Sequence, residues 1–551
     1  MIPIIQREFF GILRMPRALA AIVVMAAAFA LLVLARWPSD GVVDLSGAQS
    51  RQVFRVFAYG LLGGVLLLAP AFPATSIVRE KIKGTLALLF NSPLTPLAIY
   101  GGKLLGVLLF TGLLLLTSVP AAAACYAMGG IDLVRDVASL YAILAFIAVQ
   151  YVAVGLLVST LAQTPDSAVR ITYGVVFALC FATLGPNYLF QGQEGLTADG
   201  AYWIRRLSPV PVLMQMVGQG SAGSQGMLES AGGLGEFFVV NGLVTLGIMG
   251  FTLSRLNYRI FDRARSSGVI TDDQKLGVRV VRRFMFLVDP QRRKAGIPFY
   301  LNPIMVKEFR TRRFGRFHWL LRLVAICAVL SLLLTFAATN STMDWGVETI
   351  GGLLVMFQVL LVVLLTPSLA SGLISSERES GGWDVLRMTT ISGVRLVTGK
   401  LASVAWTLAL LLFATAPGYL VMIFIQPVMW LQVSKVMICL VLTAGYTLAL
   451  SAAVGAWFNR TATSTVTVYV VLMCVFLGPL LIWLGREAPF GHDVVQAALC
   501  LNPMGAALSI IEMPGFAQYE LTPASWWVAG VVIVGALSAL VVRIWRLMRP
   551  M

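Results

Sequence analysis

A repeated stretch of sequence predicts the fold of this chain. Residues 2–9 read IPIIQREF, and residues 302–309, 300 positions later, read NPIMVKEF. Both have proline second and end in a basic residue followed by Glu-Phe. Further matches are Glu80 with Glu377, Gly84 with Gly381, Gly102-Lys103-Leu104 with Gly399-Lys400-Leu401, and Gly185-Pro186 with Gly478-Pro479. A repeat this long exceeds any solenoid period. It therefore predicts two copies of one folded unit.

The composition places both copies in a membrane. Of the 551 residues, 58% are hydrophobic and 12% are charged, whereas a soluble chain carries about 25% charged residues. Twelve apolar stretches approach the roughly 20 residues that a helix needs to cross a bilayer. They are Ala18–Ala35, Val53–Phe72, Leu104–Ala124, Val137–Leu161, Ile171–Phe190, Phe237–Ser254, Trp319–Ala338, Ile350–Ala370, Leu401–Ile423, Leu431–Ala456, Thr465–Leu484 and Trp526–Ile544. We predict an all-α integral membrane protein with about twelve transmembrane helices, built as two tandem six-helix halves.

The basic residues orient these helices. With both termini in the cytoplasm, 33 of the 41 lysines and arginines fall in cytoplasmic segments and 8 in outer segments, in line with the positive-inside rule. We expect a multi-pass protein of the inner (plasma) membrane with both termini cytoplasmic. The net charge of +16 then follows from topology, so membrane lipid is an expected partner and nucleic acid is not.

Each half opens with a short amphipathic segment. In the first half Ile5, Phe9 and Ile12 share one helical face, while Arg7 and Arg14 lie on the other. Such a helix lies in the headgroup plane with its apolar side toward the bilayer. We predict an N-terminal elbow helix in each half, either touching a cytoplasmic partner or serving as a plain anchor. Its candidate site residues are Arg7, Glu8, Lys307 and Glu308.

A charged connection follows the second span of each half. Residues 77–89 read IVREKIKGTLALL, and residues 374–386 read ISSERESGGWDVL. Charged residues come first and apolar residues follow; in the first half Pro93 and Pro96 then end the helix. The equal spacing favours a functional cytoplasmic helix in both halves, although common ancestry of the halves would also explain it.

Together these motifs resemble the type-2 permeases of ABC exporters. The first half carries the pattern in Pro70, Glu80, Gly84-Thr85-Leu86, Ser92-Pro93-Leu94-Thr95 and Gly102-Lys103-Leu104-Leu105; the second carries it in Pro367, Glu377-Arg378-Glu379, Gly381 and Gly399-Lys400-Leu401. The resemblance covers the elbow helix, the six spans and the loop after the second span in both halves. Ile82 replaces the second glutamate of the pattern, Gly382 its threonine and Thr390 its proline.

The resemblance implies a function. In that family the loop after the second span is a coupling helix that docks on a separate cytoplasmic ATPase. The implied contact residues are Glu80, Gly84, Thr85, Glu377, Arg378, Glu379 and Gly381, and Lys103 and Lys400 stand where the third spans begin. The chain would be the transmembrane permease subunit of an ATP-driven exporter, with ATP and Mg²⁺ held by the partner subunit. The sequence does not identify the substrate.

The sequence lacks the motifs of an ATPase or of another enzyme. Residues 398–401 read TGKL, without the Ser or Thr that follows the lysine of a phosphate-binding loop. The chain has two histidines, His318 and His492, and no HExxH motif. We therefore expect a transport subunit rather than an enzyme, with no metal and no cofactor of its own.

Two other classes of function remain open. A twelve-span secondary carrier usually holds ionisable residues near mid-membrane, and the predicted spans are nearly free of them. A non-transporting membrane scaffold is the second alternative. We expect the double substitution Glu80→Ala with Glu377→Ala to uncouple or release the ATPase. Folding and membrane insertion should stay intact, because neither carboxylate is expected inside the apolar bundle.

The domain boundaries follow from the repeat. Residues 1–262 form the first six-span half, residues 263–300 a basic cytoplasmic linker, and residues 301–551 the second half. Before each sixth span, Leu207-Ser208-Pro209 and Leu501-Asn502-Pro503 lead into apolar stretches too short to cross the membrane. By the same resemblance these stretches are short re-entrant outer helices.

Overall fold

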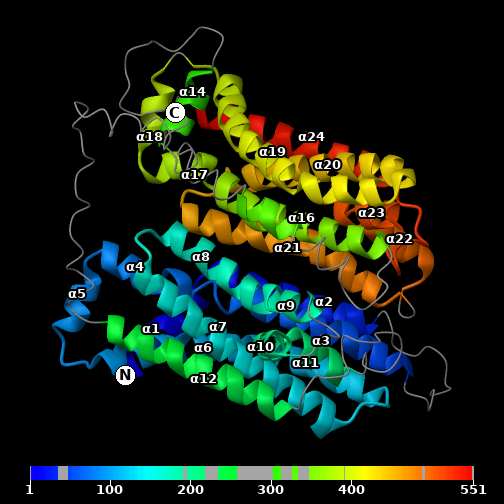
Figure 1. Cartoon of the computed structure of the whole chain (residues 1–551). Helices are drawn as coiled ribbons and strands as arrows, with labels where there is room; N and C mark the ends of the chain where they lie inside the picture. The colour runs from blue at the N-terminus through cyan, green and yellow to red at the C-terminus, as the bar shows by residue number, and fades with distance from the viewer. Residues whose placement is uncertain are drawn as a thin grey trace. The chain divides into compact units, whose positions relative to one another are not determined.

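The protein is all-α. The computed structural model describes residues 2–34, 48–189, 195–217, 234–256, 302–311, 325–332, 347–389, 391–486 and 490–548, and every regular element within them is a helix (Figure 1). In these residues 10 helices are long and apolar enough to cross a membrane, or 12 if each of two bent helix pairs counts as one span. The predicted all-α integral membrane fold is confirmed.

The 10 long helices coincide with the predicted second to sixth and eighth to twelfth spans. The first predicted span corresponds to residues 18–34. This helix and the elbow helix Ile2–Leu13 form a bent pair, and the angle between the two helices is 66°. The predicted seventh span, Trp319–Ala338, lies outside the described residues except for 325–332. The basic linker, residues 263–300, also lies outside them.

The chain divides into two compact units, which are described separately. Unit 1 is Met1–Arg263 with Leu480–Val495, and unit 2 is Ala264–Pro479 with Gln496–Met551. The predicted domain boundaries remain predictions.

Unit 1 begins with the elbow helix. Its helices are α1 (Ile2–Leu13), α2 (Pro16–Leu34), α3 (Ala48–Leu68), α4 (Pro73–Ile82), α5 (Thr85–Phe90), α6 (Pro96–Ala127), η1 (Leu133–Ala138), α7 (Ser139–Leu161), α8 (Pro165–Phe177), η2 (Ala178–Ala182), α9 (Leu184–Leu189), α10 (Leu196–Arg205), α11 (Val210–Met216) and α12 (Leu234–Arg255). The elbow helix α1 packs against α6, and α4 packs against α7 and α8. Phe57, Phe110 and Tyr151 are among the largest buried side chains of the core.

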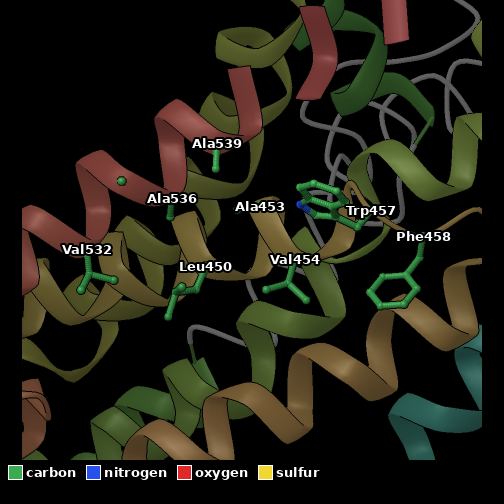
Figure 2. Close-up of a pocket in the computed structure, with 9 residues that line it drawn as sticks. Leu450, Ala453, Val454, Trp457, Phe458, Val532, Ala536 and Ala539 are labelled. Carbon is green, nitrogen blue, oxygen red and sulfur yellow. The ribbon is translucent and has the colours of Figure 1, made fainter. Parts of the chain in front are cut away.

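Unit 2 repeats this order, except that the end of α21 and the start of α22 are assigned to unit 1. Its helices are α14 (Pro303–Thr311), α16 (Val347–Ala370), α17 (Gly372–Glu379), α18 (Gly382–Arg387), α19 (Gly393–Ile425), η5 (Pro427–Met429), α20 (Trp430–Gly455), α21 (Thr461–Leu484), α22 (His492–Cys500), α23 (Pro503–Ile510) and α24 (Ala524–Met548). The elbow helix α14 packs against α19, as α1 does against α6. The last helix, α24, packs along α20, and Figure 2 shows the apolar side chains between them.

Capping residues and prolines fix where several helices begin. Thr95 and Ser392 cap the third-span helices α6 and α19 through their hydroxyl oxygens, which accept from Ala98 N at 3.2 Å and from Arg395 N at 3.4 Å. A side-chain oxygen at this position satisfies a backbone N–H that the helix leaves free. Prolines follow the caps of α6, α8 and α23 at the first helical position, where a missing N–H is harmless. In the predicted re-entrant segment, α22 and α23 meet at 112°.

Candidate functional site

The second span of each half is longer than the sequence predicted, and it carries the candidate glutamates. In unit 1, α3 and α4 form one stretch from Ser50 to Ile82, with a break at residues 69–72. In unit 2, α16 and α17 form one stretch from Glu348 to Glu379. Glu80 lies in α4, a separate helix after the break, and the six-residue helix α5 follows it. The expectation that this segment faces the cytoplasm remains a prediction.

Four predicted residues of the first half meet in one ion cluster, which we call the first cluster: Arg7, Glu8, Glu80 and Lys103. The Lys103 Nζ lies 2.9 Å from Glu8 Oε1 and 2.9 Å from Glu80 Oε2, and it donates to Ser76 Oγ at 3.0 Å. Arg7 Nη2 bridges the same two carboxylates, at 2.8 Å to Glu8 and 2.6 Å to Glu80. The elbow helix, the second span and the third span are thereby joined at one point.

The second cluster consists of the equivalent residues Lys307, Glu308, Glu377 and Lys400. The Lys400 Nζ lies 2.6 Å from Glu308 Oε1 and 3.2 Å from Glu377 Oε1. Lys307 Nζ lies 2.7 Å from Glu377 Oε1. The same three elements of unit 2 are thus joined by the same pattern of charges.

Both clusters are electrically balanced, and each has a buried lysine at its centre and an exposed cation, Arg7 or Lys307, at its edge. Each contains two cations and two carboxylates, and the central lysine side chains of Lys103 and Lys400 are 1% and 2% exposed. The side chains of Glu80 and Glu377 are 14% and 15% exposed. These two carboxylates are thus largely covered by the elbow helix and the third span rather than fully exposed. Because removing one partner of a buried ion pair strands the other charge, the expectation that folding tolerates their joint replacement by alanine loses its basis.

A glycine in the left-handed conformation follows each cluster. Gly84 and Gly381 both have φ of +74°, a value that side chains disfavour and glycine adopts freely. Each glycine ends the helix that carries the glutamate and starts a six-residue helix, α5 or α18. The glycine that follows each glutamate by four residues in the sequence therefore forms the same turn in both halves.

The short helices α5 and α18 present apolar side chains that the sequence analysis did not single out. Leu88 of α5 is 69% exposed, and Val385 of α18 and Met388 just after it are 66% and 86% exposed. Exposed apolar side chains on a short charged connection are typical of a contact surface. The signal in the sequence was weak, because helices of six residues are too short to show a periodic pattern.

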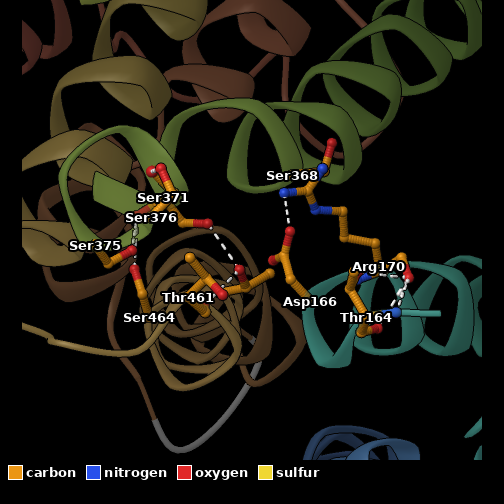
Figure 3. A network of polar contacts seen from close by, with 12 residues as sticks. Thr164, Asp166, Arg170, Ser368, Ser371, Ser375, Ser376, Thr461 and Ser464 are labelled. Carbon is orange, nitrogen blue, oxygen red and sulfur yellow. Dashed lines mark hydrogen bonds and ion pairs between the residues drawn. The ribbon is translucent and has the colours of Figure 1, made fainter. Parts of the chain in front are cut away.

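A serine of a neighbouring helix contacts the last part of each second span. In unit 1 the Ser159 hydroxyl of α7 accepts from Ile77 N at 3.0 Å and Val78 N at 3.1 Å. In unit 2 the carbonyl oxygen of Ser371 accepts from the hydroxyls of Ser464 at 2.7 Å and Ser375 at 3.2 Å (Figure 3). These bonds tie α4 to α7 and, at the break before α17, tie the Ser371 backbone to α21.

Three further predicted site residues lie beside the clusters and make other contacts. Thr85 Oγ1 donates to the Glu80 carbonyl at 3.4 Å. Glu379 Oε2 accepts from Thr461 N at 2.9 Å and Thr461 Oγ1 at 2.7 Å, which caps α21. The positive charge of Arg543 on α24 acts on the Arg378 guanidinium.

Glycines let the elbow helix approach the third span closely. A Cβ atom added to Gly102 would lie 2.8 Å from Ile4 Cγ2, and one added to Gly106 would lie 2.7 Å from Glu8 Cβ. In unit 2 the equivalent Gly399 lies against the Asn302 side chain, 2.7 Å from its Oδ1 by the same measure. The Gly-Lys motif of each third span thus combines close packing with a buried cation.

Residues 2–194 match the model of a family described as ABC-2 family transporter protein. This part of the chain is therefore similar to an ABC-2 family transporter domain. The match runs from α1 through α9 and includes the whole first cluster, so the predicted resemblance is confirmed for the first half. Among curated proteins, none matches the chain.

Proposed function

We propose that the chain is the membrane permease of an ATP-driven ABC exporter and that both of its halves transmit the movement of a separate cytoplasmic ATPase. The ABC-2 domain and the helices long enough to cross a membrane support a transport permease. The observation that carries the coupling role is the duplicated layout: in each half a buried ion cluster joins three elements directly before a glycine turn and a short helix with exposed apolar side chains.

The roles proposed for the glutamates and the short helices differ from those that the sequence suggested. Glu80 and Glu377 hold α4 and α17 to the elbow helix and the third span, while α5 and α18 touch the ATPase through Leu88, Val385 and Met388. A displacement of α5 or α18 is then passed to the second span through the glycine turn and to the elbow and third span through the cluster. Binding of ATP changes the conformation of the permease only if the contacts of the ATPase differ between the conformations of the permease.

The distribution of buried charge disfavours the secondary-carrier alternative. Among the described residues, the buried charged side chains are Lys103, Arg205, Arg206, Glu308 and Lys400. All of them lie near helix ends or in short elements rather than at the middle of a span. A proton- or ion-coupled carrier usually needs such groups near mid-membrane.

Site-specific photo-crosslinking tests the proposed docking surface. A photoreactive residue at Leu88 or Met388 should form a crosslink in native membranes to a protein that binds ATP. A photoreactive residue at Val134, which is 76% exposed and belongs to a predicted outer segment, is the matched control and should not. The proposal fails if Leu88 and Met388 form no crosslink to an ATP-binding protein, or if Val134 forms the same one.

A further inference from the structure

A groove between α20 and α24 of unit 2 has no role in the coupling site. Its volume is about 460 Å³, within the range of sites that bind small molecules. The groove is lined by small residues: Ala536 and Ala539 of α24 face Ala453 of α20 (Figure 2), and Gly535 also lines it. Elsewhere the same two helices touch, since Trp526 Nε1 lies 3.0 Å from Cys439 Sγ.

The groove opens on an apolar surface. On α24, Val531 and Val534 are 70% and 67% exposed, and Trp457 beside the groove is 57% exposed. Side chains of this kind meet lipid tails in a membrane protein, with tryptophan favoured at the edge of the bilayer. The surroundings therefore suit a hydrocarbon chain.

The groove leads toward an arginine. Val532, Ala536, Ala539 and Arg543 follow one another at helical spacing on one face of α24, so Arg543 lies one turn beyond the last groove residue. Its guanidinium stands 4.9 Å from the centre of the Trp457 ring. The apolar groove and the positive charge thus form one continuous surface.

A second arginine strengthens this positive end. The positive charge of Arg543 acts on Arg378 of α17. Among the described residues, Arg378 Nη1 and Arg543 Nε are buried without a hydrogen-bond partner. The carboxylates next to Arg378 in the sequence are already engaged, Glu377 by Lys307 and Lys400 and Glu379 by Thr461. Two guanidiniums with unused donors call for an anion, and a phosphate oxygen is the acceptor that their geometry matches best.

We propose that an anionic phospholipid of the cytoplasmic leaflet binds here, with one acyl chain in the groove between α20 and α24 and its phosphate on Arg378 and Arg543. A zwitterionic lipid has the same acyl chain and phosphate, but its cationic headgroup is repelled by the same two arginines. The cytoplasmic leaflet is the anionic one, and the predicted topology places these arginines there. Because Arg378 neighbours Glu377, the lipid also touches the helix that carries the second cluster.

Native mass spectrometry of the purified full chain tests this proposal without reference to any ATPase, so its outcome is independent of the proposed function. Phosphatidylglycerol and phosphatidylcholine of equal chain length are titrated in turn. We expect one phosphatidylglycerol to bind in preference to phosphatidylcholine. The variant Arg378→Gln with Arg543→Gln should weaken that binding about thirtyfold, since each basic residue near the membrane surface contributes about a fivefold effect.

Two further variants keep the test decisive. Ala539→Phe fills the groove, retains both arginines and should also remove the bound lipid. The control Arg395→Gln with Arg460→Gln removes two exposed arginines of the same unit and should leave binding unchanged. Equal binding of the two lipids, unchanged binding after Arg378→Gln with Arg543→Gln or after Ala539→Phe, or a dimer of the chain that Ala539→Phe abolishes would overturn the proposal.

Discussion

The first and second clusters hold the same four charges at equivalent positions, yet they differ in burial. The Glu8 side chain is 19% exposed, whereas that of Glu308 is 4% exposed. In the first cluster Arg7 bridges both carboxylates and Ser76 adds a third acceptor for the lysine. The position equivalent to Ser76 in the second half is Leu373, which is buried. The duplication thus kept the charges that join the three elements, while the groups that support them diverged.

The largest expected effect comes from removing the central lysine. Lys400→Met leaves Glu308 almost fully buried without its closest cation, and we expect a loss of stability of about 3–5 kcal/mol. Lys103→Met should cost less, about 1–3 kcal/mol, because Arg7 still contacts both Glu8 and Glu80. The midpoints of thermal unfolding of the two variants in detergent measure the difference. If Lys103→Met is the more damaging change, the deeper burial of the second cluster does not determine its energetics.

An equal and smaller effect is expected at the two glycine turns. Gly84→Ala and Gly381→Ala should each cost about 1–2 kcal/mol, because a side chain at positive φ is strained while open space surrounds the added Cβ atom at both positions. Gly112→Ala, in open space on α6, is the control and should not destabilise the protein. Thermal unfolding of the three variants gives the comparison. A clear inequality between Gly84→Ala and Gly381→Ala would show that the two turns are not equivalent.

The smallest expected effect is at the serine that one half has and the other lacks. Ser76→Ala removes one hydrogen bond to Lys103 and should cost about 1 kcal/mol. The ion pairs of Lys103 with Glu8 and Glu80 remain. Unfolding of Ser76→Ala alone and combined with Lys103→Met measures the coupling between the two side chains. Strictly additive effects would mean that the Ser76 contact does not support the lysine.

The sequence was informative where the halves repeat. Arg7, Glu8, Glu80 and Lys103 recur at nearly the same spacing in the second half, and this repeat singled out residues that the structure brings together. Burial of the glutamates was not predictable from the sequence, because Glu80 stands among charged residues that suggest a solvated helix. Its contacts with Arg7 and Lys103 depend on tertiary packing, which brings α1 close to α6 at Gly102 and Gly106.

Contacts between distant elements were also beyond the sequence. Arg378 was expected at an ATPase contact, but it lies beside Arg543, 165 residues away in the chain. No local pattern links the end of the second span to the last helix. The role of Arg378, Glu379 and Thr85 at the ATPase therefore remains a prediction.

Amide hydrogen exchange in Lys400→Met tests most directly whether each cluster positions the coupling helices of its own half. We predict faster exchange at residues 372–388, which include α17 and α18, and unchanged exchange at the equivalent residues 73–90 of the first half. The reciprocal variant Lys103→Met should reverse the pattern. Unchanged exchange at residues 372–388 in Lys400→Met, or an equal increase in both halves, would contradict the account.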